Sequence, residues 1–155
     1  SYRLAKVCAE NYLVNSQLPW LICRYFNVYG EHSKAGHFVA DQIEKIGRGE
    51  FSIIGPDETR SFCYVSDAIA ATIHCAETVN QQVINIGNDR EIRILDAANI
   101  IADALGHHDV NWDIKPSLPG STAVRRPDIS KLRKTMTSYN PISFEEAIAR
   151  MIKKS

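Results

Sequence analysis

The sequence predicts an α/β protein, in which strands and helices alternate along the chain. Two patterns predict this class. In several segments apolar side chains recur at three- and four-residue spacing, as in amphipathic helices, and short apolar runs bounded by Gly or Pro lie between those segments. Because 45% of the 155 residues are hydrophobic, the chain is also large enough to bury one core.

Each apolar pattern predicts one element. The helical spacing is found in residues 2–15, 36–48, 68–77, 94–105, 129–136 and 143–153. The composition of strands is found in residues 20–29, 51–54, 61–65 and 82–86. The run 20–29 is almost wholly apolar and aromatic, which is typical of a strand buried on both faces of a parallel sheet.

Polar residues and glycine predict where several helices begin and end. Ser66 and Asp67 precede the segment 68–77, and we expect them to cap it. Ser143 and Glu146 have the spacing of a capping box at the start of the last helix. Gly106 follows the segment 94–105 and is expected to end it.

The overall charge excludes several classes of partner. The 18 Lys and Arg residues balance the 18 Asp and Glu residues, so no net field favours nucleic acid or an acidic membrane surface. Apolar runs also stay well short of the roughly 20 residues that span a bilayer. We therefore expect no nucleic-acid partner and no membrane partner.

The cysteines and histidines indicate neither disulfides nor a metal. The four cysteines, Cys8, Cys23, Cys63 and Cys75, lie in apolar stretches without a Cys-x-x-Cys pair, which favours free thiols in a reducing cytoplasm. The five histidines do not have the spacing of a metal-binding triad. We expect a cytoplasmic protein without a metal site.

Tyr2 and Lys6 form the first candidate catalytic pair. They are four residues apart on the first expected helix, so their side chains project from one face. A nearby cation favours the phenolate, which a general acid/base acting on a sugar hydroxyl requires. The same spacing also occurs by chance on many helices, where it is only a half-buried tyrosine beside a solvated lysine.

Four further motifs follow this pair in order. They are Arg24-Tyr-Phe-Asn-Val-Tyr-Gly30, Gly55-Pro-Asp-Glu-Thr-Arg-Ser-Phe-Cys-Tyr-Val-Ser-Asp67, Ile84-Asn-Ile-Gly87 and Arg125-Arg-Pro-Asp-Ile129. With these intervals, the chain resembles the extended short-chain dehydrogenase/reductase family, in particular its nucleotide-sugar epimerases, dehydratases and decarboxylases. The resemblance runs from Ser1 to the final helix.

The resemblance implies a more specific fold. The chain would form the carboxyl-terminal part of a doubly wound Rossmann-type parallel sheet plus a smaller α/β substrate-binding lobe. Residues 1–30 and 63–87 would complete the dinucleotide-binding domain, and residues 31–62 and 88–155 would form the lobe. The glycine-rich phosphate loop and the upstream serine or threonine of such enzymes have no match, and the chain begins directly in a patterned helix. We therefore expect a missing amino-terminal half.

The resemblance also implies the cofactor and its contacts. The cofactor would be NAD, with NADP as the alternative. Tyr2 would be the acid/base, and Lys6 would assist it and hold the nicotinamide ribose. Tyr25 would lie beside the nicotinamide, although a purely structural role in the core is the other interpretation.

The substrate, a nucleotide-diphosphate sugar, would be held by a second set of residues. Asn27 would contact it through its amide, and the backbone of Ser52 and Ile53 would border the base. Arg60 would face the diphosphate, for which a planar guanidinium is well suited. Arg125 and Asp128 would hold a phosphate and the ribose hydroxyls, with Arg126 as the alternative to Arg125. A turn cap at Asn27 and a surface arginine at position 60 are the structural alternatives.

Several functions remain open at this point. The first expectation is epimerisation through a keto-sugar, because it requires no further acid/base residue. A 4,6-dehydratase or a decarboxylase shares its first step. A non-catalytic nucleotide-sugar-binding fragment, or a half that docks on a separate amino-terminal chain, is the alternative outside catalysis. The isolated chain is expected to be inactive, and the complete enzyme to be a homodimer.

Overall fold

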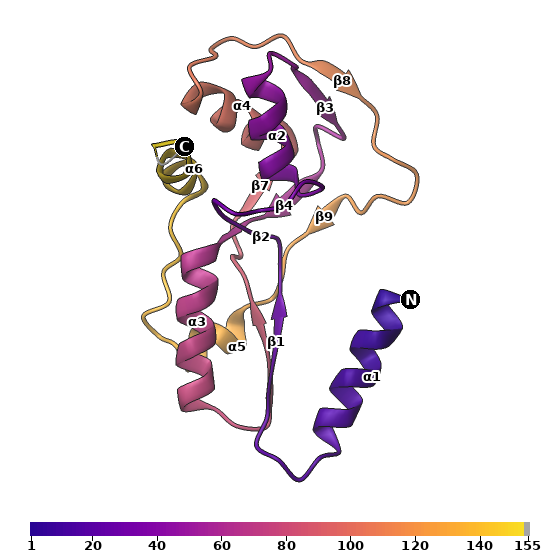
Figure 1. Cartoon of the computed structure of the whole chain (residues 1–155), viewed down its shortest axis with the longest axis vertical. Coiled ribbons are helices and arrows are strands. Elements are labelled where there is room, and N and C mark those ends of the chain that lie inside the picture. Colours follow the sequence, from indigo (N-terminus) through magenta and orange to yellow (C-terminus); the bar gives the residue numbers. More distant parts are fainter. Residues whose placement is uncertain (154–155) are drawn as a thin grey trace.

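The structure is a computed structural model that describes residues 1–153 and has the α/β architecture predicted from the sequence (Figure 1). Its helices are α1 (Tyr2–Val14), α2 (Phe38–Gly47), α3 (Val65–Thr78), α4 (Ile94–Ala104), α5 (Ser130–Thr135) and α6 (Phe144–Lys153). Its strands are β1 (Leu21–Tyr25), β2 (Val28–Tyr29), β3 (Ser52–Ile54), β4 (Thr59–Ser61), β5 (Cys63–Tyr64), β6 (Gln82–Ile86), β7 (Glu91–Arg93), β8 (Asp113–Lys115) and β9 (Val124–Arg125).

The strands form four small sheets in which parallel pairing predominates. β1 pairs with β6 from Leu21↔Gln82 to Tyr25↔Ile86, with α3 between them in the sequence. β2 pairs with β5, and β3 pairs with β8, also in parallel. The remaining sheet has the order β7-β4-β9, in which only the β4–β7 pair is antiparallel. Two parallel strands must be joined by a long crossover connection, which is usually a helix. The alternation of strands and helices along the chain therefore accounts for the parallel pairing.

The segment 20–29 is not one strand, as predicted, but two. β1 ends at Tyr25, and β2 begins at Val28 and pairs with a different strand. Between them Asn27 has φ 42°, a left-handed conformation that Asn adopts more readily than most residues. Burial on both faces is also wrong at the end of β1, where Arg24 and Tyr25 are exposed.

The predicted cap of the helix after residue 65 is also wrong. α3 begins at Val65, its N-cap residue is Tyr64, and no side-chain bond caps it. Asp67 lies inside the first turn, where its carboxylate accepts a hydrogen bond from the backbone N–H of Ile142 at 3.1 Å. Burial raises the pKa of Asp67 above its ordinary value. The carboxylate therefore connects α3 to the carboxyl-terminal segment instead of capping its own helix.

Two other helix boundaries follow the sequence prediction. Gly106 has φ +85° and follows α4 directly after its C-cap residue Leu105, where a left-handed residue ends a helix at little cost. Ser143 accepts a hydrogen bond from the backbone N–H of Glu146 at 3.1 Å, so it caps α6 as predicted. The Glu146 carboxylate bonds to Arg150 at 2.6 Å.

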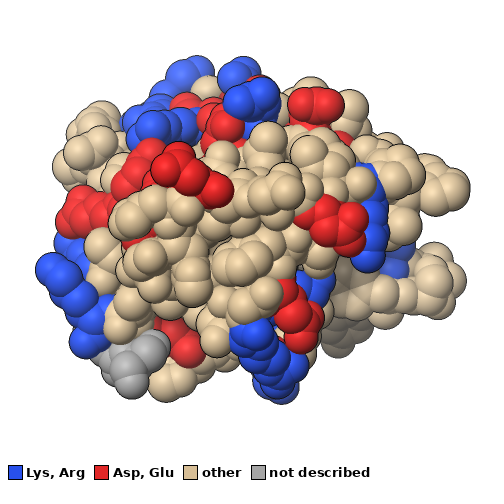
Figure 2. Space-filling model, turned by 90° about the horizontal axis from the view of Figure 1, so that it is seen from above, with Lys and Arg blue, Asp and Glu red and all other residues tan. Residues whose placement is uncertain are grey.

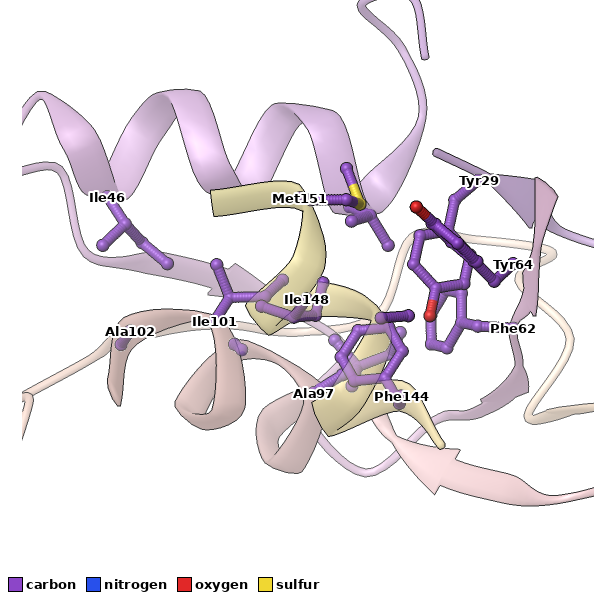
Figure 3. Packing of buried hydrophobic residues seen from close by; sticks show 14 of the residues in the cluster. Tyr29, Ile46, Phe62, Tyr64, Ala97, Ile101, Ala102, Phe144, Ile148 and Met151 are labelled. Carbon is purple, nitrogen blue, oxygen red and sulfur yellow. The ribbon is translucent and has the colours of Figure 1, made fainter. Parts of the chain in front are cut away.

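Buried side chains form two hydrophobic cores. The three-helix core lies among α2, α4 and α6 and contains fully buried Ile46, Ile101 and Ile148. Figure 3 shows the aromatic rings of this core gathered near Met151. The ring of Phe144 packs against two of the others, with its centroid 5.0 Å from that of Phe62 and 5.5 Å from that of Tyr29. Such tilted contacts add to the free energy gained by burying the rings.

The β6 core lies against the β1–β6 pair. Its fully buried residues come from α3, β5, β6 and α5 and include Cys63, Cys75, Ile84, Ile86 and Leu132. Tyr139 closes it, since its hydroxyl donates to the carbonyl of Gly87 at 2.9 Å. The structure thus packs helix α5 on β6, although about 45 residues of chain separate them.

Helix α1 contributes to neither core. None of its residues is buried, and Leu4, Val7 and Tyr12 expose about half of their surface or more. Figure 1 shows α1 standing apart from the body of the molecule. Arg24 of β1 donates to Glu10 of α1 at 2.9 Å through Nε, which connects the helix to the sheet. The apolar side chains of α1 therefore form an uncovered face.

Charged side chains of both signs are distributed over the surface (Figure 2). In the view of Figure 2, side chains of both charges lie intermixed around the rim, and other residues cover the centre. No helix within residues 1–153 is both long enough and apolar enough to cross a membrane. All four cysteines are free, and Cys63 and Cys75 are buried.

Ile101 provides a test of the three-helix core. Ile101→Ala is expected to lower the free energy of unfolding by about 2–5 kcal/mol, because it removes buried methyl groups and leaves a cavity. Ile73→Ala is the matched control, because Ile73 is also helical but 54% exposed, and it should change stability by about 0.5 kcal/mol or less. Urea unfolding of both variants measures the difference. Equal losses would show that Ile101 is not at the centre of the core.

Candidate functional site

Tyr2 and Lys6 share one face of α1, as the sequence predicts. The Lys6 ammonium nitrogen lies 5.5 Å from the centroid of the Tyr2 ring, within the range of a cation–π contact. The Tyr2 side chain is 80% exposed. A substrate hydroxyl could therefore approach the phenol from solvent, with the cation already beside it.

Tyr25 lies at the carboxyl end of β1, where ligands of parallel sheets usually bind. Its hydroxyl lies 3.0 Å from Oγ1 of Thr72 on α3, and about half of its surface is exposed. Tyr25 is therefore not a core residue. It lines an apolar depression of about 380 Å³ together with Val28, Val65, Ala68, Ile69, Thr72 and Ile73.

Asn27 is fixed by hydrogen bonds on both of its amide groups. The side-chain Nδ2 donates to the carbonyl of Ser61 at 2.8 Å, and the backbone carbonyl accepts from the N–H of Cys63 at 3.2 Å. Asn27 thus joins the end of β1 to both β4 and β5. Asn27 is exposed, and its side-chain amide points toward Ser61, the residue directly after Arg60.

Arg60 on β4 is paired with a carboxylate. Its Nη2 donates to Glu58, and its Nη1 donates to the carbonyls of Thr59 at 2.7 Å and Thr122 at 2.8 Å. The side chains of Arg60 and Glu58 are each only 12% exposed. The alternative interpretation of Arg60, a solvated arginine at the surface, is therefore wrong.

The Glu58 carboxylate is held from several sides. The hydroxyl of Ser121 donates to its Oε2 at 2.7 Å. Hydrogen bonds from Ser121 and Ser117, with the charge of Arg60, hold the pKa of Glu58 below its ordinary value. Gly55 lies directly beneath, with φ +62°, and a Cβ there would meet Oε1 of Glu58 at 2.8 Å. The carboxylate thus connects β4 to the loop before β9.

The structure distinguishes Arg125 from Arg126 by position. Arg125 is the register partner of Arg60 across the parallel β4–β9 pair, so the two project from the same face. Arg126 instead lies 3.7 Å from Glu91. It also lines a second depression, whose other lining residues are Asp89, Pro127, Asp128, Ile129, Ser130 and Arg133. Arg125 and not Arg126 therefore lies beside Arg60.

Asp128, Ser52 and Ile53 lie apart from the arginine pair. Oδ1 of Asp128 accepts from the N–H of Ser130 at 2.8 Å, and this bond lowers the pKa of Asp128. Ser52 and Ile53 lie on β3, which pairs with β8. Ile53 is 1% exposed, so the residue as a whole is covered in this structure. The roles of these residues stay predictions.

The predicted residues therefore fall into separate groups. Asn27, Arg60 and Arg125 are connected through β4, whereas Tyr2 and Lys6 lie on the projecting helix α1, and Asp128 lines the second depression. Glu58 was not among the residues predicted from the sequence. Its position two residues before Arg60 was an available signal, because residues i and i+2 share one face of an extended chain. Among residues 1–153 no three potential ligands are grouped to hold a metal.

The largely covered pair of Arg60 and Glu58 predicts a pH-dependent stability. The lowered pKa of Glu58 means that its contribution is fully present above its ordinary pKa of 4.5 and is lost as pH falls through the lower folded value. Glu58→Gln should therefore destabilise the protein most at neutral pH, and the difference from wild type should shrink in acid. Urea unfolding between about pH 7 and pH 3 measures this.

The control for this experiment is Glu50→Gln, which removes a carboxylate from an exposed position. Its unfolding curves should follow those of wild type at every pH. A difference between Glu58→Gln and wild type that is equally large at both ends of the pH range would contradict the assignment of the ion pair.

Comparisons with known proteins identify relatives over the whole chain. Residues 1–87 match the model of the NAD dependent epimerase/dehydratase family. A UDP-N-acetyl-alpha-D-glucosaminuronate decarboxylase from Bacillus cytotoxicus is 31% identical over 167 residues, which covers 98% of this chain and 52% of the relative. UDP-glucuronic acid decarboxylase 1 from Arabidopsis thaliana is 28% identical, covering 97% of this chain and 35% of the relative.

Solved structures of similar fold include nucleotide-sugar epimerases. The UDP-glucuronic acid 4-epimerase from Bacillus cereus, in complex with UDP-glucuronic acid and NAD, has a TM-score of 0.82 at 27% identity and covers 96% of this chain and 50% of its own. The UDP-glucose 4-epimerase from Thermotoga maritima, with UDP-glucose, has a TM-score of 0.80 at 26% identity and covers 95% and 49%.

The chain spans about half the length of most of these relatives, and its fold is a partial Rossmann fold. The matched segment 1–87 is more than half of the chain and contains the Tyr2–Lys6 pair, Tyr25, Asn27 and Arg60. On these grounds the chain belongs to the NAD-dependent epimerase/dehydratase family.

Proposed function

We propose that this chain is part of an enzyme that epimerises a UDP-sugar through a keto-sugar intermediate, with NAD as cofactor. The observation that carries the proposal is the pairing of Tyr2 with Lys6 on an exposed helix face in a member of this family. Oxidation of a sugar hydroxyl needs a group that removes its proton, and the Tyr2 phenol has the required chemistry. The proton acceptor is the phenolate form of Tyr2, which becomes a neutral phenol in this step. The positive charge of Lys6 offsets the negative charge of that phenolate, and Lys6 holds the nicotinamide ribose.

The residues of the chain fit NAD chemically. The apolar depression beside Tyr25 offers one aromatic ring and several aliphatic side chains at the carboxyl end of a parallel strand, which suits a flat nicotinamide ring. NAD, when bound, supplies the acceptor for the hydride that leaves the sugar carbon. NADP is the alternative, because the chain offers no residue that we assign to the discrimination of the two.

Substrate binding is proposed for the strand ends around β4. Arg60 and Arg125 face the diphosphate, because they are neighbours across the β4–β9 pair and guanidinium groups suit phosphate oxygens. The exposed Asn27 contacts the sugar, and the backbone of Ser52 and Ile53 borders the base. Asp128 and its depression take the ribose hydroxyls. These assignments rest on position and on the relatives that bind UDP-sugars.

The complete enzyme is proposed to contain a further amino-terminal half and to form a homodimer. Two observations support this: the chain spans about half of its relatives, and the apolar side chains of α1 are uncovered. Ile69 and Ile73 on α3 are exposed as well. The isolated chain therefore has no turnover, because the cofactor is held mainly by the other half.

Decarboxylation is the second candidate, and the curated relatives favour it. Decarboxylation and epimerisation share their first step, the oxidation of a sugar hydroxyl to a ketone. If the sugar is a uronic acid, oxidation at C4 places a ketone β to the carboxylate. The bond from C5 to the carboxyl carbon can then break, with its electron pair passing into the carbonyl and carbon dioxide leaving. Epimerisation instead returns the hydride to the other face of the ketone.

The products distinguish the two reactions. The full-length protein with NAD should convert UDP-glucose or UDP-glucuronic acid into its C4 epimer of unchanged mass, identified by mass spectrometry and proton NMR. Release of carbon dioxide and a UDP-pentose from UDP-glucuronic acid would identify the decarboxylase instead. If no UDP-sugar is converted with NAD or NADP, both candidates are wrong and the non-catalytic alternative is favoured.

Tyr2→Phe tests the catalytic assignment in the full-length protein. It removes the proton acceptor and should lower kcat by about 100-fold or more, while the Kd for UDP changes little. Tyr12→Phe is the matched control, because Tyr12 lies on the same helix and is also exposed, and its kcat should equal that of wild type. Steady-state kinetics measures kcat, and calorimetric titration measures the Kd for UDP. Unchanged turnover in Tyr2→Phe would falsify the mechanism.

A further inference from the structure

The pair formed by Arg60 and Glu58 presents a contradiction for the proposed substrate site. Arg60 is the side chain assigned to the diphosphate, yet its charge is already balanced by Glu58, and the pair is largely covered. Both of its terminal nitrogens donate within the protein, Nη1 to the backbone carbonyls of Thr59, Thr122 and Ala123, and Nη2 to Glu58 and to the hydroxyl of Ser121. A diphosphate can bond to these two terminal nitrogens only if one of their present acceptors moves away.

Glu58 is the acceptor that a diphosphate can replace. The carbonyls of Thr59 and Thr122 belong to the backbone that carries Arg60 and to the loop beside it, whereas the Glu58 carboxylate is a side-chain anion. A diphosphate carries more negative charge than a carboxylate and offers more oxygens to the planar guanidinium. Arg125, the register partner of Arg60, would add a second cation, and no carboxylate within residues 1–153 pairs with it.

Glu58 also holds the segment 116–123. Ser121 donates to its carboxylate at 2.7 Å, and Ser117 is a second donor. The same segment is attached to Arg60 through the carbonyl of Thr122 at 2.8 Å and to the N–H of Thr59 through the carbonyl of Ala123 at 2.8 Å. The hydroxyl bonds to the carboxylate would be lost when the carboxylate moves, while the backbone bonds would remain.

We propose that Glu58 occupies the position of the substrate diphosphate on Arg60 in the ligand-free protein, and that binding exchanges the carboxylate for the diphosphate and releases the serine contacts of segment 116–123. Glu58 is thus a specificity-determining residue that lowers the affinity of the arginine pair for anions. The inference rests on the proposed function, because it takes UDP as the group that Arg60 binds.

The exchange predicts that neutralising Glu58 strengthens binding. Glu58→Gln keeps an acceptor oxygen for Arg60 and Ser121 but removes the competing charge, so UDP should bind the full-length protein about three- to tenfold more tightly. The affinity for uridine, which lacks phosphate, should not change. Asp57→Asn is the matched control, because it removes one negative charge from the same turn at an exposed position, and its UDP affinity should equal that of wild type.

Ser121→Ala provides a second variant that leaves every charge in place. It removes one hydrogen bond that holds Glu58, so UDP should again bind more tightly, by a smaller factor than in Glu58→Gln. A pair with a purely structural role predicts the reverse, since both variants would then disorder the site and weaken binding. Hydrogen exchange of segment 116–123 supplies an independent readout, and it should increase in wild type when UDP is added.

Calorimetric titration of the four proteins with UDP and with uridine separates the outcomes. Tighter UDP binding by Glu58→Gln and Ser121→Ala, with Asp57→Asn unchanged, supports the exchange. If wild type binds UDP and both variants bind it equally or more weakly, the exchange is wrong and the proposed function stands. If none of the proteins binds UDP, the proposed function fails, and the exchange fails with it.

Discussion

The arrangement of the strands depends on the backbone at Asn27. Phe26 makes the last bond to β6, since its N–H donates to the carbonyl of Ile86 at 3.0 Å, and Asn27 then accepts from the N–H of Cys63 at 3.2 Å. One residue in the left-handed conformation thus transfers the chain from pairing with β6 to pairing with β5. The Asn27 side chain adds a bond to Ser61, so three strands meet at this residue.

This junction determines which side chains lie near one another. Tyr25 is the last residue of β1, and its side chain lies against α3, where its hydroxyl is near Thr72 and its ring lines the apolar depression. Because β2 continues into the other sheet, Tyr29 enters the three-helix core with Phe62 and Phe144. The two cores are therefore joined along a single stretch of chain, and the candidate substrate residues lie close to the point where they join.

Charge in the candidate site is organised by short-range pairing and not by a net field. The chain has equal numbers of acidic and basic residues, and both kinds are intermixed on the face shown in Figure 2. The pair of Arg60 and Glu58 is mostly covered, where charges interact more strongly than at the surface, whereas the ion pairs of Arg93 with Asp96 and of Arg48 with Glu44 are exposed and contribute little. An anion that enters the site therefore meets two arginines, of which one is neutralised by the protein itself.

The sequence alone determined the elements whose cause is local. The six helices lie where the apolar spacing predicts them, and the strand 82–86 has the predicted bounds. Gly106 and Ser143 act on the ends of their own helices. Tyr2 and Lys6 share a face because helical periodicity alone sets their separation. Strands β7, β8 and β9 were not predicted, because each is only two or three residues long.

Only the tertiary structure decided the features that depend on distant partners. The strand predicted at 20–29 is divided because Ser61 and Cys63 bond to Asn27, and Asp67 does not cap its helix because the N–H of Ile142 takes its carboxylate. Arg125 rather than Arg126 lies beside Arg60 because β9 pairs with β4 in one register. Glu58 neutralises Arg60 because serines from a loop about 60 residues later hold its carboxylate in place. No local pattern encodes these contacts, since each joins groups that come together only when the chain is folded.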